Sequence, residues 1–110
     1  MEITERRTAD IVTLSLAGKL DTTAAKTFEA KILAQIESGD RRFIIDLAQL
    51  DYISSSGLRV FVLAAKRLDS GNDKIALCSL QDPVREVFDI VGFLSVFSVY
   101  GSHDEAISSL

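Results

Sequence analysis

Three consecutive serines and a glycine, Ser54-Ser55-Ser56-Gly57, form the stretch of this sequence best suited to chemistry. They follow an apolar run that ends at Leu47 and precede an apolar helical segment that reaches about Asp69. This pattern places the serines at a helix N-terminus, where backbone N–H groups lack intrahelical partners and carry partial positive charge. Such a position suits a hydroxyl cap, and it equally suits an oxyanion or a phosphate. One cap needs one serine, so two readings stay open: a capped helix with no further role, or a hydroxyl that accepts a phosphate.

A phosphate at this position would have a defined physical effect on binding. The helix dipole and the free N–H groups stabilise a phosphoserine at a helix N-terminus, so the domain need not unfold to accept one. The modification adds about −1.5 to −2 charges to one small surface. A partner that lies flat on that surface would lose contacts and desolvation energy. The stretch therefore favours binary control of binding without a conformational change.

The titratable residues of the chain do not form a recognisable catalytic or metal centre. The only histidine, His103, is expected at the surface near a helix start, away from any nucleophile. Cys78 lies in an apolar strand and is expected in the core. Asp21 and Asp46 are better explained as caps at strand ends than as a carboxylate pair. Metal-ligand spacing and both phosphate-loop patterns are missing from the sequence. These absences remove most catalytic readings, and we expect that the protein is not an enzyme.

The composition is that of a soluble globular protein. The chain has 110 residues, of which 47% are hydrophobic and 25% charged, so we expect one domain over residues 1–110. No apolar run approaches the ~20 residues that span a bilayer, and the N-terminal residues lack a signal-peptide pattern. A single cysteine fits a reducing cytoplasm, where we expect the protein. The net charge of −4 argues against nucleic acid or an anionic membrane as a partner.

Hydrophobic periodicity predicts the elements that position the serines. The expected order is β-β-α-β-α-β-α-β-α, with strands over residues 3–7, 11–17, 42–47, 74–80 and 94–100. The first two helices are expected from a cap at Asp21 or Thr22 to about residue 38, and from the serines to about residue 69. The third is expected to have Asp82 as its cap and Pro83 at its first position, and to end at Gly92. A capping box of Ser102 and Glu105 predicts a fourth, short helix near the C-terminus. A turn is expected at residues 70–73.

Alternating strands and helices imply a largely parallel sheet with right-handed crossovers and one antiparallel element. Residues 42–47 are apolar on both faces, which predicts a central strand. Sites in open α/β sheets lie beyond the carboxyl ends of strands. Two such ends, residues 18–23 and 53–58, are therefore expected to be neighbours at one edge of the molecule. The helix after the serines is expected to be buried nearly all round over its first three turns, with Leu58 and Phe61 in the core.

The segments just described resemble the STAS domain family, the domain of bacterial anti-sigma factor antagonists and of the cytoplasmic tails of sulfate transporters. The turn Gly18-Lys19-Leu20-Asp21 is similar to the family's Gly-x-Leu-Asp. The matching segments that follow in the family's order and spacing are the Asp46-Leu47 strand end, the Tyr52 to Val60 loop and helix, the Asp82 to Gly92 helix and Phe93. The resemblance covers nearly the whole chain. It implies an α/β, STAS-type fold: a mixed sheet of four to five strands with about four helices packed mainly on one face.

The resemblance also implies a function, an anti-sigma factor antagonist in a phosphorylation-controlled partner switch. The family's single-domain antagonists carry Asp-Ser-Ser/Thr-Gly-Leu-Gly-Val and are phosphorylated on the first serine, which matches Ser55, with Ser54 and Ser56 as rivals. The unphosphorylated form would bind an anti-sigma factor that is also a serine protein kinase, which releases the sigma factor. Phosphorylation would end binding, and a metal-dependent serine phosphatase would reset the protein. ATP and the metal would belong to these partners, so the resemblance implies no cofactor for this chain. The implied partner-binding residues are Asp21, Thr22, Thr23, Ser54, Ser55, Ser56, Gly57, Leu58 and Arg59.

Two positions depart from the family's pattern, and two other functions stay open. Ser54 stands where the family has an acidic residue, and Arg59 stands where it has its second glycine. Arg59 lies about one turn into the helix, where it can pair with an acidic partner, shield a phosphate or simply be solvated. One alternative is a non-switching STAS interaction subunit of a transporter or other signalling complex. The other is a small enzyme or nucleotide-binding protein that uses the helix N-terminus as an anion site, which the missing phosphate loop disfavours.

Overall fold

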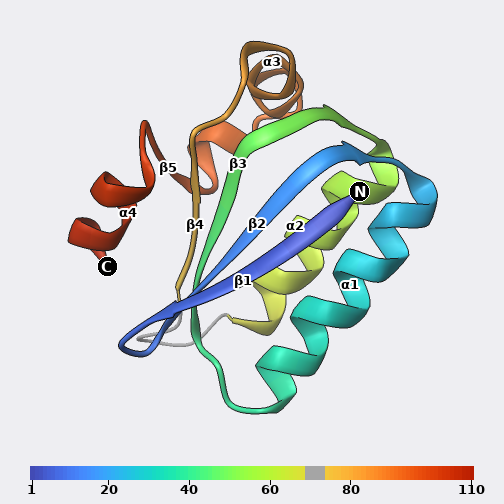
Figure 1. Cartoon of the computed structure of the whole chain (residues 1–110). Helices are drawn as coiled ribbons and strands as arrows, with labels where there is room; N and C mark the ends of the chain where they lie inside the picture. The colour runs from blue at the N-terminus through green and yellow to red at the C-terminus, as the bar shows by residue number, and fades with distance from the viewer. Residues whose placement is uncertain (69–73) are drawn as a thin grey trace.

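A computed structural model describes residues 1–68 and 74–110, and its strands and helices follow the predicted order (Figure 1). The strands are β1 (Glu2–Thr8), β2 (Ile11–Leu20), β3 (Arg42–Ile53), β4 (Lys74–Cys78) and β5 (Ser98–Tyr100). The helices are α1 (Thr22–Glu37), α2 (Ser55–Arg67), α3 (Asp82–Ile90) and α4 (His103–Ser109), with a 3₁₀ turn, η1 (Phe93–Ser95). The turn predicted at residues 70–73 lies outside the described residues.

The five strands form one mixed sheet in the order β1-β2-β3-β4-β5. β1 pairs antiparallel with β2, and every other neighbouring pair is parallel. After the first hairpin, each connection between consecutive strands therefore contains a helix, as the alternation of elements predicted. The prediction that residues 42–47 lie in a central strand is confirmed, since β3 has two strands on either side.

The two faces of the sheet are covered unequally, which confirms the expectation that most helices pack on one face. The main core joins one face of the sheet to α1, α2 and α3, and it includes Phe28, Phe61 and Phe88 from those helices. On the other face a smaller cluster gathers around α4, where Ala106 packs with Ile11, Ile44 and Cys78. This second cluster buries Ile11 and leaves Thr13 almost inaccessible, so the start of β2 is covered on both faces.

β3 is longer than predicted because it continues through a bulge. The strand was expected to end at Leu47, but pairing with β2 resumes with Gln49 opposite Ala17 and continues to Ile53. At the bulge, the Asp46 carboxylate accepts a 3.0 Å hydrogen bond from the amide of Ala48, two residues later in the same strand. Asp46 is therefore not a strand-end cap, and the polar residues after Leu47 mark a local kink instead of a strand end.

The C-terminal third differs from prediction in three element boundaries. The strand expected over residues 94–100 is wrong at its start: Phe93–Ser95 is a 3₁₀ turn and only Ser98–Tyr100 pairs with β4. β4 ends at Cys78, and the backbone of Ser79 turns away with φ +60°. α3 has its N-cap at Gln81, one residue before the predicted Asp82, and no side chain caps it.

α2 is buried along one face and not nearly all round, so that prediction is wrong. Val60, Phe61 and Ala64 point into the core, together with Gly57. Leu58 is only half-buried, although it packs against the edge of the main core. The sequence shows two apolar stripes on this helix, and α1 lies beside α2 (Figure 1). Outside the buried face, Val62, Leu63 and Ala65 are only half-buried.

The expected surface position of His103 is also corrected. Its ring is half-buried, and Nε2 lies 2.8 Å from Oγ1 of Thr13, a side chain that is almost fully buried. The contact joins the first residue of α4 to β2. His103 therefore has a structural role in seating α4 on the second face of the sheet.

Candidate functional site

The two strand ends that were predicted to be neighbours do meet at one edge of the sheet. Leu20, the last residue of β2, pairs with Ile53, the last residue of β3. The amide of Ser54 then donates a 2.9 Å hydrogen bond to the carbonyl of Leu20. This bond fixes the start of α2 against the start of α1. The helix that follows each strand therefore begins within the same small region of surface.

Asp21 and Ser54 cap the two helices. Oδ1 of Asp21 accepts a 2.9 Å bond from the Ala24 amide, which settles the alternative between Asp21 and Thr22 in favour of Asp21. Oγ of Ser54 accepts a 3.1 Å bond from the Gly57 amide, and Ser54 has the extended backbone that an N-cap requires. Each side chain thus satisfies one of the free N–H groups of its helix.

The other two serines are placed differently from the cap. Ser55 is the first residue of α2 and is exposed, whereas Ser56 is the second and is half-buried. Ser54 is half-buried as well, and its oxygen already accepts the capping bond. Among the three hydroxyls, that of Ser55 is the most open to another molecule.

Gly57 allows α2 to start directly against the strands. A Cβ added at this position would lie 2.8 Å from Cγ of Leu20, closer than real Cβ contacts, and 3.1 Å from Cγ1 of Ile53, which is tighter than most of them. Both of these neighbours are core side chains with little room to move. A glycine here is therefore required by the close approach of helix and sheet, and not by an unusual φ.

A groove between α1 and α2 brings together part of the predicted partner-binding set. Its walls carry Ser56 and Arg59 from α2, and Thr22 with its neighbours Ala25, Lys26 and Glu29 from α1. Asp21 and Thr23 line a separate hollow together with Met1. Five of the nine predicted residues therefore line these two depressions, Thr22, Ser56 and Arg59 in one and Asp21 and Thr23 in the other. Gly57 is buried, and Leu58 packs half-buried against the edge of the main core.

Sequence reasoning missed Lys26 and Glu29 as lining residues of this groove. Both follow Thr22 at helical spacing, four and seven residues along, so they share its face of α1. That spacing was visible in the sequence. It was uninformative until the structure showed that this face of α1 borders α2.

The environment of Cys78 and the spacing of potential metal ligands can be read from the described residues. Burial raises the pKa of the Cys78 thiol to about 11, and the nearby charge of Asp46 adds to this, so the reactive thiolate is scarce at neutral pH. No cluster of three potential metal ligands occurs among residues 1–68 and 74–110. The groups present at the two helix starts are hydroxyls, backbone amides and a few charged side chains.

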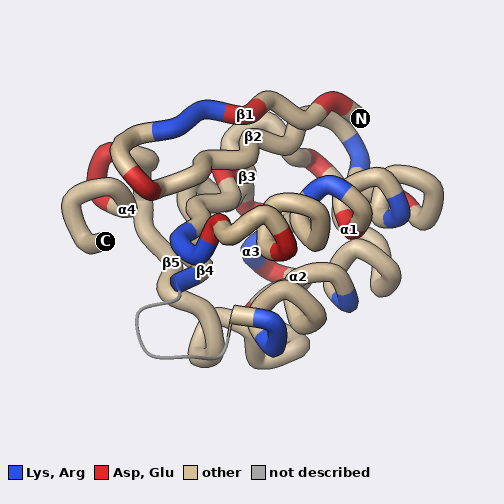
Figure 2. Tube along the Cα trace, turned by 90° about the horizontal axis from the view of Figure 1, so that it is seen from below, with Lys and Arg blue, Asp and Glu red and all other residues tan. Residues whose placement is uncertain are grey.

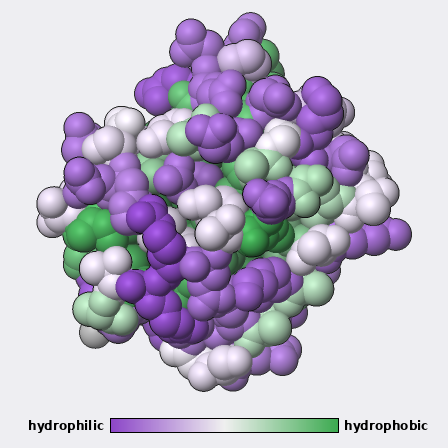
Figure 3. All heavy atoms as spheres, viewed as in Figure 1, coloured by the Kyte–Doolittle hydropathy of each residue, from purple (hydrophilic) through white to green (hydrophobic). Residues whose placement is uncertain are grey.

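The described surface of the molecule carries mixed charge. Lysine, arginine, aspartate and glutamate residues are scattered along the described trace, without a long block of one sign (Figure 2). The face shown in Figure 3 is mostly hydrophilic, with small apolar areas between polar side chains. None of the helices in the described ranges is both long and apolar enough to cross a membrane.

Comparison with known proteins identifies the family. The STAS domain family matches residues 2–106. A Bordetella bronchiseptica protein, BtrV, described as a candidate anti-sigma factor antagonist, is 41% identical over 109 residues, which cover 99% of this chain and 94% of that protein. An anti-sigma-B factor antagonist of Listeria monocytogenes is 35% identical over 100 residues, which cover 90% and 86% of the two chains. The chain therefore belongs to the STAS domain family.

A solved structure has the same fold as this chain over nearly its full length. The anti-sigma factor antagonist SpoIIAA in its unphosphorylated form superimposes with a TM-score of 0.86 at 25% identity, covering 98% of this chain and 95% of that one. The Bacillus protein has also been solved in its phosphorylated form, with a TM-score of 0.79. The five-stranded mixed sheet and four helices described above are thus the STAS fold that the sequence resemblance implied. Membership of this family of regulatory domains supports the prediction that the protein is not an enzyme.

Proposed function

We propose that this protein is an anti-sigma factor antagonist whose binding is controlled by phosphorylation of Ser55. The unphosphorylated form binds an anti-sigma factor that is also a serine protein kinase, and the sigma factor is released. The kinase transfers the γ-phosphoryl group of ATP to Oγ of Ser55, which loses its proton, and ADP leaves. A metal-dependent serine phosphatase then hydrolyses the phosphoester to inorganic phosphate and restores the serine. ATP and metal belong to these partners, and we place the cycle in the cytoplasm.

The observation that carries the proposal is the exposed hydroxyl of Ser55 at the first position of α2. Ser54 is occupied as the cap of the same helix, and Ser56 is half-buried in the groove between α1 and α2. A kinase needs an acceptor oxygen that it can approach, and Ser55 offers one. The names of the relatives, anti-sigma factor antagonists, support the choice of partner, and the existence of a phosphorylated form of SpoIIAA supports this type of control.

Ser54 in place of the family's acidic residue is compatible with this proposal. Aspartate and serine are both good N-cap residues, and the Ser54 hydroxyl forms the bond to the Gly57 amide that such a cap makes. The helix start that presents Ser55 is therefore kept. The substitution removes one negative charge beside the acceptor hydroxyl, so a partner surface need not be complementary to an acid at this position.

A phosphate on Ser55 changes the surface while leaving the fold in place. The first amides of α2 and the positive end of its dipole favour an anion there, and the added charge is about −1.5 to −2. A partner that packs flat on Ser55 in the unphosphorylated state must then either desolvate this charge or separate. Binding is lost through electrostatics and sterics at one position, without rearrangement of the sheet.

Phosphate mapping with matched variants tests this proposal. The protein is incubated with ATP and its cognate anti-sigma kinase, and incorporated phosphate is located by peptide mass spectrometry. We expect one phosphate in the unaltered protein and in Ser56→Ala, and none in Ser55→Ala. Ser54→Asp is the matched control at the neighbouring position, because it removes the hydroxyl and keeps a capping side chain. Loss of phosphate in Ser54→Asp or Ser56→Ala, with retention in Ser55→Ala, would refute the assignment.

Binding measurements separate the switch from the alternative of a constitutive interaction subunit. Ser55→Asp should weaken binding to the same kinase at least tenfold, whereas Ser55→Ala should bind like the unaltered protein. Equal binding by both variants would favour a non-switching STAS subunit. That alternative is motivated by the two departures from the family's pattern, Ser54 in place of an acidic residue and Arg59 in place of a glycine.

A further inference from the structure

Arg59 is the cation of α2 that lies nearest in sequence to the serines. It is exposed and lines the groove between α1 and α2 together with Ser56. It also stands four residues after Ser55 within one uninterrupted α-helix, Ser55–Arg67. Side chains four residues apart lie on the same face of a helix, with Cβ atoms about 5–6 Å apart. The guanidinium is therefore within reach of any group attached to Oγ of Ser55.

The order of the two residues favours an ion pair with an anion on Ser55. In isolated helices a pair is more stable when the anion precedes the cation by four residues, since the anion then also meets the positive end of the dipole. Arginine is suited to phosphate because its planar fork donates two parallel hydrogen bonds. A phosphate on Ser55 would have both the first amides of α2 and the Arg59 fork as donors.

Arg59 is available for such a pair in the unphosphorylated state. Within residues 1–68 and 74–110 it takes part in no ion pair and no side-chain hydrogen bond. Arg7 and Arg42, by contrast, are held by Asp40 and Asp10. Holding a phosphate would therefore break no existing contact of Arg59 with the described residues.

The charged groups around the groove leave Arg59 as the best-placed cation. Lys26 and Glu29 face it from α1 and have opposite signs. Asp21 uses one carboxylate oxygen to cap α1, and Lys19 is paired with Asp51 at 3.7 Å where the strands end. Among the described residues that line the groove, Lys26 is the one rival cation. It belongs to the other helix, so its distance from Ser55 is not fixed by helical spacing.

We propose that Arg59 binds the phosphate of phosphorylated Ser55 as an intrahelical counter-ion. The inference rests on the proposed phosphorylation of Ser55 and adds a residue to its regulation. The two states of the protein then differ at two positions, because the phosphorylated form gains an anion and also withdraws a free guanidinium from the partner-facing surface. Arg59, which stands where the family's antagonist motif has its second glycine, thereby becomes part of the switch in this chain.

Titration of the phosphate by ³¹P NMR tests the inference without any partner. Phosphoserine is installed at position 55 of the full chain during translation, and its second ionisation is followed from about pH 4.5 to 8 at low salt. A nearby guanidinium favours the dianion. Arg59→Gln should therefore raise the titration midpoint by about 0.2 to 0.4 pH unit, the size expected for one surface pair of this geometry. Arg59→Lys should fall between the two, and added salt should reduce the difference.

Two matched variants make the outcome decisive. Arg67→Gln removes an exposed cation from the far end of the same helix and should leave the midpoint unchanged. Lys26→Gln removes the cation across the groove and should shift the midpoint less than Arg59→Gln does. Equal midpoints for Arg59→Gln and Arg67→Gln, or a larger shift in Lys26→Gln, would overturn the assignment. Because the phosphate is installed without a kinase, failure here leaves the mapping of Ser55 unaffected, and failure of that mapping leaves this measurement intact.

Discussion

Each of the three adjacent serines occupies a different environment. Ser54 is the N-cap of α2, Ser55 is exposed at the first helical position, and Ser56 is half-buried beside α1. The sequence predicted that one of the three would cap the helix, since capping requires one serine. Their identical side chains left the choice open. The choice of Ser54 as the cap goes with the 2.9 Å hydrogen bond that its amide donates to the carbonyl of Leu20, a contact between distant parts of the chain.

Alanine substitutions should separate the cap from the acceptor. Ser54→Ala removes the acceptor of the Gly57 amide and should lower the free energy of unfolding by about 0.5–2 kcal/mol. Ser55→Ala removes an exposed hydroxyl and should change it by less than about 0.5 kcal/mol. Urea denaturation followed by circular dichroism measures both values. A larger loss in Ser55→Ala than in Ser54→Ala would mean that Ser55 is a structural residue first.

α2 connects the candidate site to the core, and Phe61 is the residue that anchors it. Its ring centroid lies 5.3 Å from that of Phe28 in α1, 5.4 Å from that of Phe88 in α3, and 6.2 Å from that of Phe97. Phe61 is fully buried, so one side chain joins three helical elements to the segment before β5. The position of the serines therefore depends on aromatic packing two turns further along the same helix.

Truncation of this anchor should be much more costly than truncation of Leu58. Phe61→Ala leaves a large cavity at the centre of the aromatic cluster and should lower the free energy of unfolding by about 3–5 kcal/mol. Leu58→Ala removes a half-buried side chain and should cost about 1–2 kcal/mol, since only part of its surface leaves water on folding. Guanidinium denaturation of both variants provides the comparison. Similar losses for the two would contradict the one-sided burial of α2.

At the scale of elements, the sequence predicted which elements exist better than where they end. The order of strands and helices follows from periodicity and from the Asp21, Pro83 and Gly92 boundary signals, because these depend on nearby residues. The end of β3 was missed because a bulge at Ala48 breaks the alternation without ending the pairing. The start of β5 was missed because Phe93 and Phe97 turn inward as neighbours on a helical turn, with ring centroids 5.6 Å apart.

At the scale of the whole molecule, the relation between the two halves of the site came from topology. Residues 18–23 and 53–58 are far apart in sequence, yet parallel strands place their carboxyl ends at one edge, so their proximity was predictable. The groove lined by Lys26 and Glu29 was not predictable, because the sequence did not show which face of α1 borders α2. The resemblance to the STAS family predicted the overall fold. The details of the surface depend on how the helices pack, which the sequence did not show.

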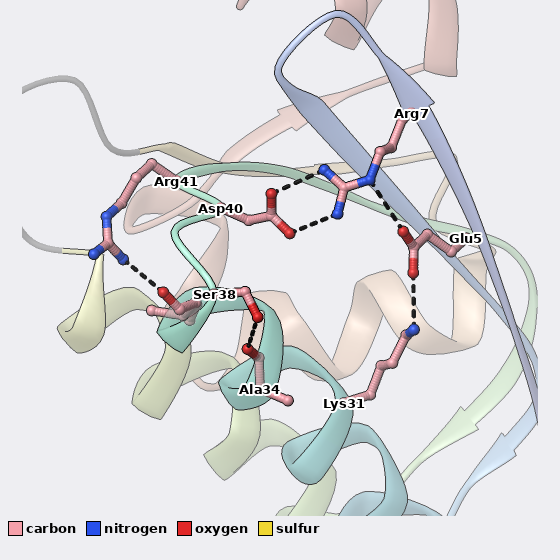
Figure 4. A network of polar contacts seen from close by, with 8 residues as sticks. Glu5, Arg7, Lys31, Ala34, Ser38, Asp40 and Arg41 are labelled. Atoms are coloured by element: carbon pink, nitrogen blue, oxygen red, sulfur yellow. Dashed lines mark hydrogen bonds and ion pairs between the residues drawn. The ribbon is translucent and has the colours of Figure 1, made fainter.

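A polar network ties the edge strand β1 to the rest of the molecule, on the side where α1 ends (Figure 4). Arg7 makes a two-pronged contact with Asp40, with nitrogen–oxygen distances of 2.9 and 2.8 Å, and Lys31 of α1 lies 2.8 Å from Glu5. The hydrogen bond from Arg7 holds the pKa of Asp40 below its ordinary value, and the one from Lys31 does the same for the pKa of Glu5. Both carboxylates are therefore bound more tightly to their partners when ionised.

The pKa values of Asp40 and Glu5 are lower in the folded than in the unfolded protein. The two ionised carboxylates therefore stabilise the fold fully at a pH above their unfolded pKa values, and this stabilisation is lost as the pH falls through their folded pKa values. Asp40→Asn should therefore lower the thermal midpoint at pH 7, and its difference from the unaltered protein should shrink steadily below about pH 4. The contacts are partly exposed, so added salt at pH 7 should also reduce the difference. Arg85→Gln, at an exposed position with no ion pair to the described residues, is the matched control and should show neither dependence. A deficit of Asp40→Asn that stays constant from pH 7 to pH 3 would mean that Asp40 stabilises the fold through its shape and hydrogen bonds and not through its charge.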